Sequence, residues 1–166
     1  MNTPEHTIAD ALGQLLLRDT RQGLYASLTA GIDGVDATTY PVLSGLARLG
    51  ETTSSELAAR VGLDRSVTSR HAAALERAGL VERHAHDRDR RANTLALTRA
   101  GHAAIELTRQ RLDQHLRTFL QMHTTNDAER LALLLPGLVD YLRNPQDETH
   151  SRNSPAAASR PDPAGP

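Results

Sequence analysis

Hydrophobic residues recur three or four positions apart along most of this chain, which is the spacing of one face of a helix. This pattern predicts helices over about residues 5–30, 38–49 and 99–123. A last helix is predicted from Asn126, which has capping-box spacing with Glu129, through Leu142. Pro136 lies inside that segment and should kink or split it.

Between residues 50 and 80 the runs of helical spacing become shorter. Two short helices, about 54–61 and 65–78, are predicted on either side of a tight turn at residues 61–63, which is helix-turn-helix spacing. Thr53 followed three residues later by Glu56 indicates a capping box at the start of the first helix. Asp64 is placed to cap the second helix, and Thr98 to cap the later helix at residue 99.

Period-2 alternation then replaces the helical spacing. Leu95 and Leu97 point one way in the segment Asn93–Leu97 while Thr94 and Ala96 point the other way, as in a half-buried strand. With Leu80–Ala85 this segment predicts a β-hairpin. A helix-turn-helix followed by a hairpin is a winged helix. The expected fold class is therefore mainly α with a small β-hairpin wing.

The expected organisation is a winged helix-turn-helix flanked by N- and C-terminal dimerisation helices. The leucine stripes of the flanking helices are more apolar surface than a winged helix of about 65 residues could cover, and two-fold pairing would bury them. The predicted parts are an N-terminal dimerisation helix (1–35), a DNA-binding domain (36–98), C-terminal dimerisation helices (99–143) and a disordered tail (144–166). The tail holds five of the eight prolines.

Composition narrows the class of protein. The chain has 166 residues, of which 39% are hydrophobic and 23% charged, as in an ordinary soluble globular protein. The absence of cysteine excludes disulfides, thiolate metal sites and control by thiol oxidation. No apolar run approaches the ~18 residues that cross a bilayer. The first apolar segment is interrupted by Asp10 and Gln14 and has no basic region before it, so we expect no signal peptide and a cytoplasmic protein.

The net charge of −1 conceals a basic segment. Between Arg60 and Arg91 eight arginines stand against five acidic residues, which gives +3 locally before histidine is counted. The densest charge is HDRDRR at residues 86–91, the predicted hairpin tip. Local charge of this sign attracts a polyanion. Arginine suits the narrow, strongly negative minor groove, and Asp89 is spaced to hold Arg91 in a fixed orientation.

The helix at 65–78 has two different faces when it is projected at about 100° per residue. Thr68, Ala72, Leu75 and Gly79 fall together as the inward face. The outward face carries arginine and serine, which hydrogen-bond to base edges in the major groove, and a small alanine that permits close approach. The predicted groove contacts are Arg65, Ser66, Val67, Ser69, Arg70 and Ala73. The predicted contacts of the wing with DNA are Arg88, Asp89, Arg90 and Arg91. The predicted contacts with the DNA backbone are Thr53, Ser54, Arg77 and Arg83.

The segment SELAARVGLDRSVTSRHAAALERAGLVER, followed by DRDRRANTLALTRAG, resembles the MarR family of bacterial transcription regulators. The resemblance implies a homodimer that binds a pseudo-palindromic operator. It matches Ser69 and Arg70 to the groove-facing pair, and Asp89 and Arg91 to the Asp-x-Arg of the wing. The chain departs from the family at Asp87, where proline is common, and at Thr68, where valine is usual. The Thr68 hydroxyl would stand in a packed site, which is tolerable if it bonds to a carbonyl of the preceding turn.

The sequence therefore predicts a DNA-binding transcriptional repressor. Its partners would be a double-stranded DNA operator, a second copy of the chain and a small-molecule effector, whose pocket the resemblance places between the winged helix and the dimer helices, with an apolar lining. No enzyme, catalytic residue, cofactor or membrane partner is predicted, because no nucleophile elbow, P-loop, dinucleotide fingerprint or HExxH motif occurs.

Two alternatives stay open. One is a helical homodimeric interaction module of the same fold that does not bind specific DNA. The other is a metal-responsive variant, which the eight histidines suggest but their spacing does not favour. His84 and His86 are placed instead near DNA phosphate, where their charge would rise at lower pH.

Overall fold

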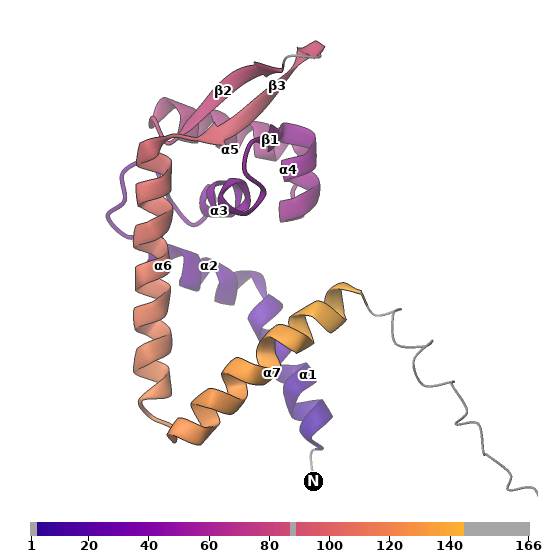
Figure 1. Cartoon of the computed structure of the whole chain (residues 1–166), viewed down its shortest axis with the longest axis vertical. Helices are drawn as coiled ribbons and strands as arrows, with labels where there is room; N and C mark the ends of the chain where they lie inside the picture. The colour runs from indigo at the N-terminus through magenta and orange to yellow at the C-terminus, as the bar shows by residue number, and fades with distance from the viewer. Residues whose placement is uncertain (1–2, 87–88, 145–166) are drawn as a thin grey trace, which may run out of the picture. The chain divides into compact units, whose positions relative to one another are not determined.

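A three-stranded antiparallel sheet and three short helices build the centre of the winged helix. The computed structural model describes residues 3–86 and 89–144, without the side chains of 86–92. The elements are α1 (Pro4–Leu16), α2 (Arg18–Thr29), α3 (Tyr40–Leu49), β1 (Thr52–Thr53), α4 (Ser54–Val61), α5 (Arg65–Arg77), β2 (Val81–His86), β3 (Asp89–Leu97), α6 (Arg99–Leu120) and α7 (Thr125–Arg143) (Figure 1). The predicted fold class, mainly α with a hairpin wing, is confirmed.

The sheet has the strand order β1-β3-β2, with β3 in the middle. Val81 pairs with Leu97 at the base of the hairpin, and Thr52 pairs with Leu95 on the other side of β3. The hairpin was predicted and β1 was not. Two residues are too short to show an alternating pattern, so the sequence carried no signal for this strand.

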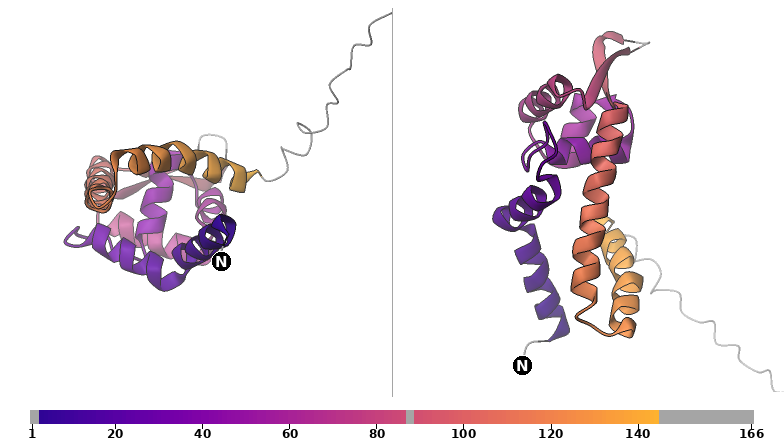
Figure 2. Two further views of the ribbon diagram at one scale, coloured as in Figure 1. Left: turned by 90° about the horizontal axis from the view of Figure 1, so that it is seen from below. Right: turned by 90° about the vertical axis from the view of Figure 1, so that its left-hand side faces the viewer.

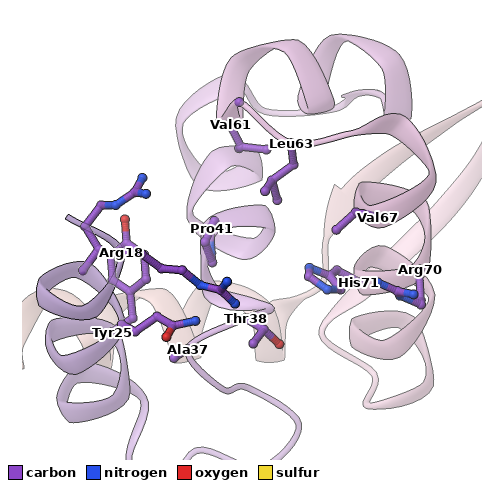
Figure 3. A pocket seen from close by; sticks show the side chains of 13 residues that line it. Arg18, Tyr25, Ala37, Thr38, Pro41, Val61, Leu63, Val67, Arg70 and His71 are labelled. Atoms are coloured by element: carbon purple, nitrogen blue, oxygen red, sulfur yellow. The ribbon is translucent and has the colours of Figure 1, made fainter. Parts of the chain in front are cut away.

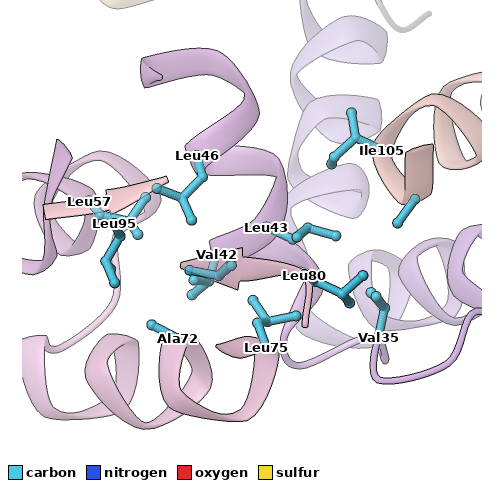
Figure 4. Close-up of a cluster of buried hydrophobic side chains, with 12 residues drawn as sticks. Val35, Val42, Leu43, Leu46, Leu57, Ala72, Leu75, Leu80, Leu95 and Ile105 are labelled. Atoms are coloured by element: carbon cyan, nitrogen blue, oxygen red, sulfur yellow. The ribbon is translucent and has the colours of Figure 1, made fainter. Parts of the chain in front are cut away.

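The hydrophobic core lies between α3, α4, α5 and the sheet (Figure 4). The side chains with no more than 1% exposure in this cluster are Val42, Leu43, Leu46, Leu57, Ala72, Leu75 and Leu95. The first turn of α6 closes one end of it at Gly101, where a Cβ atom would lie 2.1 Å from the carbonyl oxygen of Leu80. Only glycine permits that approach.

The chain divides into two compact units, one up to Leu116 and one from Arg117 onward. α1 and α2 belong to the first unit and α7 to the second. None of the residues of α1 or α7 is buried.

The prediction of a single helix over residues 5–30 is wrong. The chain forms α1 and α2 instead (Figure 2), with a break at Leu17, where ψ is 146°. The apolar phase explains the break. At about 100° per residue, the stripe that contains Ile8 and Leu12 and the stripe that contains Leu24 and Leu28 lie about 160° apart, on nearly opposite sides of one continuous helix. Interrupting the helix allows each stripe to face its own surroundings.

The helix caps agree with the sequence in two places. Thr53 and Glu56 form the predicted capping box at α4. Thr98 caps α6, since its hydroxyl accepts from the Gly101 amide at 3.1 Å and donates to the Gly79 carbonyl at 2.7 Å.

Two other predicted caps are wrong. Asp64 precedes α5 but makes no side-chain cap bond. The capping box of α7 is formed by Thr124 and Asp127, two residues earlier than the predicted Asn126 and Glu129. Hydrogen bonds from Thr124 hold the pKa of the Asp127 carboxyl below its ordinary value. α7 also runs through Pro136 as one helix, so the predicted split does not occur.

Thr68 introduces a polar atom into the core side of α5. Its side chain is 0% exposed, and the hydroxyl has no hydrogen-bond partner among the described residues, so the carbonyl bond that would make it tolerable is not formed there. A buried hydroxyl without a partner costs about 1–3 kcal/mol.

We predict that Thr68→Val raises the free energy of unfolding by about 1 kcal/mol, because valine has the same shape and no unpaired polar group. Thr108→Val is the matched control: Thr108 is 1% exposed, but its hydroxyl donates to the Ile105 carbonyl at 2.8 Å. That variant should not gain stability. Urea unfolding of both variants provides the measurement, and equal effects would contradict the assignment.

Candidate nucleic-acid interface

The inward face of α5 agrees with the projection except at its end. Thr68, Ala72 and Leu75 are all 0% exposed, as predicted. Gly79 was assigned to the same face, but it lies beyond the last helical residue and is exposed. Its φ of 73° turns the chain away from the helix, so that the Leu80 amide donates to the Leu75 carbonyl at 2.9 Å. Gly79 ends the helix rather than packing beneath it.

The outward face of α5 carries the predicted groove contacts. Arg65, Ser66 and Arg70 are exposed, and Val67, Ser69 and Ala73 are half-buried. Inner packing therefore leaves guanidinium and hydroxyl groups on the opposite side of the same helix. Arginine pairs bidentately with guanine, and serine donates to or accepts from either kind of base. Contact of these residues with DNA stays a prediction.

The hydroxyl groups at the start of α4 already have partners in the chain. The Glu56 carboxylate accepts from the Thr52 hydroxyl at 2.8 Å, the Thr53 amide at 3.0 Å and the Thr53 hydroxyl at 2.9 Å. The Glu56 carboxylate would repel a DNA phosphate at this position. To bond to a phosphate, the Thr53 hydroxyl would have to give up its bond to Glu56. Ser54 is half-buried beside it. The predicted phosphate contacts of Thr53 and Ser54 stay predictions.

Both arginines that were predicted to contact the DNA backbone also make bonds within the chain. The Nε of Arg83, on β2, lies 2.7 Å from a carboxylate oxygen of Glu76, on α5, with side-chain exposures of 28% and 38%. The Nε of Arg77 donates to the Ala73 carbonyl at 3.3 Å. The Arg83 pair joins the base of the wing to α5, a positioning role that the sequence did not suggest.

His84 faces acidic groups within the chain. Its Nδ1 lies 3.3 Å from Glu51 and its Nε2 lies 3.4 Å from Glu82. Glu51 also accepts a hydrogen bond from the Thr94 hydroxyl on β3. The predicted contact of His84 with DNA phosphate stays untested, but the ring already has two carboxylates beside it.

The predicted wing contacts fall outside what the structure describes. Arg88 lies outside the described residues altogether. The backbone of Asp89, Arg90 and Arg91 belongs to β3, but their side chains, like that of His86, lie outside the description. Their contacts with DNA stay predictions.

A cavity of about 550 Å³ lies between α2 and the winged helix (Figure 3). It is formed by α2, the start of α3, the α4–α5 turn and α5. The lining was predicted to be apolar, and this is wrong, because Arg18, Arg21 and Arg70 all line it. Arg18, Arg21 and Tyr25 follow one another at helical spacing, so they share one face of α2. That spacing was the signal that the sequence offered.

One loop of this cavity is held in place by Asp36. Its carboxylate accepts from the Thr38 hydroxyl at 2.7 Å and from the Thr38 and Thr39 amides at 2.8 Å. The Thr38 hydrogen bond is the largest cause that holds the pKa of Asp36 below its ordinary value of 3.8. Ala37 and Thr38, which line the cavity, are fixed by these bonds.

The described part of the chain shows neither a metal site nor a membrane-spanning helix. Among the residues whose side chains the structure describes, 3–85 and 93–144, no group of three or more histidine and acidic side chains is arranged to hold a metal ion. The helices of this same part include none with the length and apolar character that a membrane crossing requires.

Comparison with known proteins gives a family match and a set of similar folds. A sequence model of the MarR family matches residues 33–92. No curated protein matches the chain.

Among solved structures, wild-type MarR from E. coli in its apo form is 22% identical with a TM-score of 0.68, covering 83% of this chain and 98% of that one. RV1404 from Mycobacterium tuberculosis is 20% identical with a TM-score of 0.67, covering 84% and 94%. The PcaV transcriptional regulator from Streptomyces coelicolor, solved in complex with its natural ligand, is 23% identical with a TM-score of 0.54, covering 84% and 93%. At these identities the likeness concerns the fold.

Proposed function

Through residues 33–92 this chain belongs to the MarR family of transcription regulators, and we propose that it is a repressor that binds a pseudo-palindromic operator as a homodimer. The observation that carries the proposal is the two-faced helix α5. Its inner side chains are fully buried while arginine and serine stand on its outer side. An α-helix of this kind fits the major groove of B-DNA. Because its proposed partner is the operator, we place the protein in the cytoplasm.

The proposed dimer rests on apolar surface that a single chain leaves uncovered. In α1, Ile8, Leu15 and Leu16 are 49%, 54% and 68% exposed. α7 carries a longer stripe of exposed or half-buried residues: Leu131, Leu134, Leu135, Leu138, Val139 and Leu142. Pairing two chains through these helices would bury the stripes and set the two recognition helices about one DNA turn apart, ~34 Å.

An effector is the second part of the proposal. The cavity beside α5 has a volume of about 550 Å³, which lies within the range of small-molecule sites. PcaV, which has a similar fold, was solved with its natural ligand. We propose that a small molecule bound in this cavity alters the affinity for DNA.

We predict that Arg70→Ala lowers operator affinity by about 1–3 kcal/mol and relaxes the base preference at one operator position. The operator would first be selected from random duplexes, whose bound sequences should contain an inverted repeat. Arg48→Ala, which removes an exposed arginine from α3, is the control and should leave affinity and preference unchanged. An equal loss on random DNA would argue against base reading by Arg70.

The same titrations decide between a DNA-binding regulator and an interaction module. Affinity that depends on phosphate contacts falls steeply as salt concentration rises. Affinity that stays flat with salt, or no binding to any duplex, would favour the helical interaction module.

We predict that Leu131→Glu on α7 converts the dimer to monomers and weakens operator binding, because it places a charge in the apolar stripe. Leu133→Glu is the matched control: Leu133 is 78% exposed and lies on the opposite side of the same helix. It should leave the dimer intact. Sedimentation analysis gives the oligomeric state, and a wild-type monomer, or the same outcome for both variants, would contradict the proposed interface.

A further inference from the structure

The middle of α6 makes a contact with the end of α2 that the proposed DNA-binding surface does not use. The Arg111 guanidinium donates to the Leu28 carbonyl at 2.7 Å, across 83 positions of the chain (Figure 1). Leu28 lies in the last turn of α2, where backbone carbonyls lack a donor within the helix and carry partial negative charge. A guanidinium suits such a carbonyl, because a hydrogen bond from a charged donor is about twice as strong as a neutral one.

Buried side chains surround this contact. Leu28 and Thr29 of α2 are 1% and 4% exposed, and Thr108 of α6 is 1% exposed. The hydroxyls of both threonines donate to carbonyls of their own helices, each at 2.8 Å. Arg111 itself is half-buried. The Arg111 bond is thus partly shielded from water, which makes it electrostatically stronger than a bond on the open surface.

α6 is held to the rest of the first unit at two places. In its first turns, Gly101, Ala104 and Ile105 are buried. The second place is the contact of Arg111 with α2, which lies ~15 Å further along the helix axis than Gly101. Residues 113–119, which follow, are all exposed. Arg111 therefore lies at the point where α6 leaves the winged helix.

A helix held only by its first turns could pivot there. From Gly101 to its last residue α6 continues for about 29 Å, so a pivot of roughly 10° moves that end by about 5 Å. One base pair of B-DNA rises ~3.4 Å. Through residues 121–124, α6 leads to α7, which carries the proposed dimer stripe. A small pivot is therefore enough to shift a winged helix by more than one base pair relative to the proposed dimer interface.

We infer that Arg111 is a positioning residue that sets the spacing between the two half-sites of the operator. Its bond to the Leu28 carbonyl is the second anchor of α6 and opposes the pivot, so that the two α5 helices of a dimer stand at one separation. The inference rests on the proposed function and names a residue that limits which operators the dimer accepts. Without this bond, the dimer accepts neighbouring spacings as well.

The separation can be measured without DNA. The chain has no cysteine, so Arg48→Cys at an exposed position of α3 introduces a single site for a nitroxide label. Double electron–electron resonance on the labelled full chain then gives the distance between the two labels of a dimer. We expect a narrow distance distribution in this background and a broader one after Arg111→Met, which keeps an apolar stem and removes the donors.

Arg109→Met is the matched control for the label distances. Arg109 is on the same helix, its side chain is 60% exposed, and it lies 4.0 Å from Glu106 of its own helix. This variant removes the same charge without touching the contact with α2, and it should leave the distribution narrow.

Affinities for duplexes with the selected spacing, and with one base pair added or removed, test the consequence for operator choice. We expect Arg111→Met to reduce the preference for the selected spacing by about tenfold, on the order of what one hydrogen bond from a charged group contributes. Its affinity for a duplex with a single half-site should not change, because α5 is not altered. Arg111→Lys, which can still donate to the carbonyl, should restore most of the preference.

Four outcomes would overturn the inference. Label distances in Arg111→Met that are no broader than in Arg109→Met would show that the bond does not hold α6. A spacing preference that Arg111→Met leaves at wild-type strength would separate the bond from operator choice. Equal losses of affinity on the single half-site and on the full operator would mean that Arg111 supports the fold alone. Wild-type protein that binds no duplex would refute the proposed function itself, a failure that the label distances, measured without DNA, do not share.

Discussion

The packing of three side chains beneath α5 is the constraint on which the rest of the molecule depends. Thr68, Ala72 and Leu75 are fully buried, and Ala72 and Leu75 belong to the core shared with α3, α4 and the sheet. A helix has a fixed period, so burying these positions determines which side chains face outward. The rotation of α5 about its own axis, and with it the direction of Arg65 and Arg70, is therefore determined by apolar packing.

A second set of contacts holds the wing to this helix. Arg83 on β2 reaches Glu76 on α5, and the Thr98 hydroxyl bonds to the Gly79 carbonyl at the turn where the helix ends. The close approach of Gly101 to the Leu80 carbonyl places the first turn of α6 against the same turn. The Arg83 contact spans seven residues of the chain, whereas the Thr98 contact spans nineteen and closes the hairpin. These contacts position α5 and the base of the wing together, as the proposed DNA-binding surface requires.

The parts that the sequence predicted correctly have local causes. The capping box at Thr53 and Glu56 depends on two residues three apart, and the hairpin depends on a period of two. The errors arose where several local choices compete: Thr124 and Asn126 are both good caps, and only one is used. The side chains that line the cavity could not be predicted together, because they come from four separate segments that meet only in the folded chain. The phase change between the stripes of α1 and α2 was readable, and it would have indicated a break between Leu12 and Leu24.

The most direct test of the central claim is a nuclear magnetic resonance titration of the full chain with its selected operator duplex, followed at the arginine Nε–H and backbone amide signals. The outward face of α5 should respond first, with large shifts at the Nε–H groups of Arg65 and Arg70 and at the amides of Ser66 and Ser69. The Nε–H signal of Arg48 on α3 should stay in place. Binding that leaves the α5 signals unchanged, and instead moves those of α1 or α7, would contradict the assignment of α5 as the helix that reads DNA.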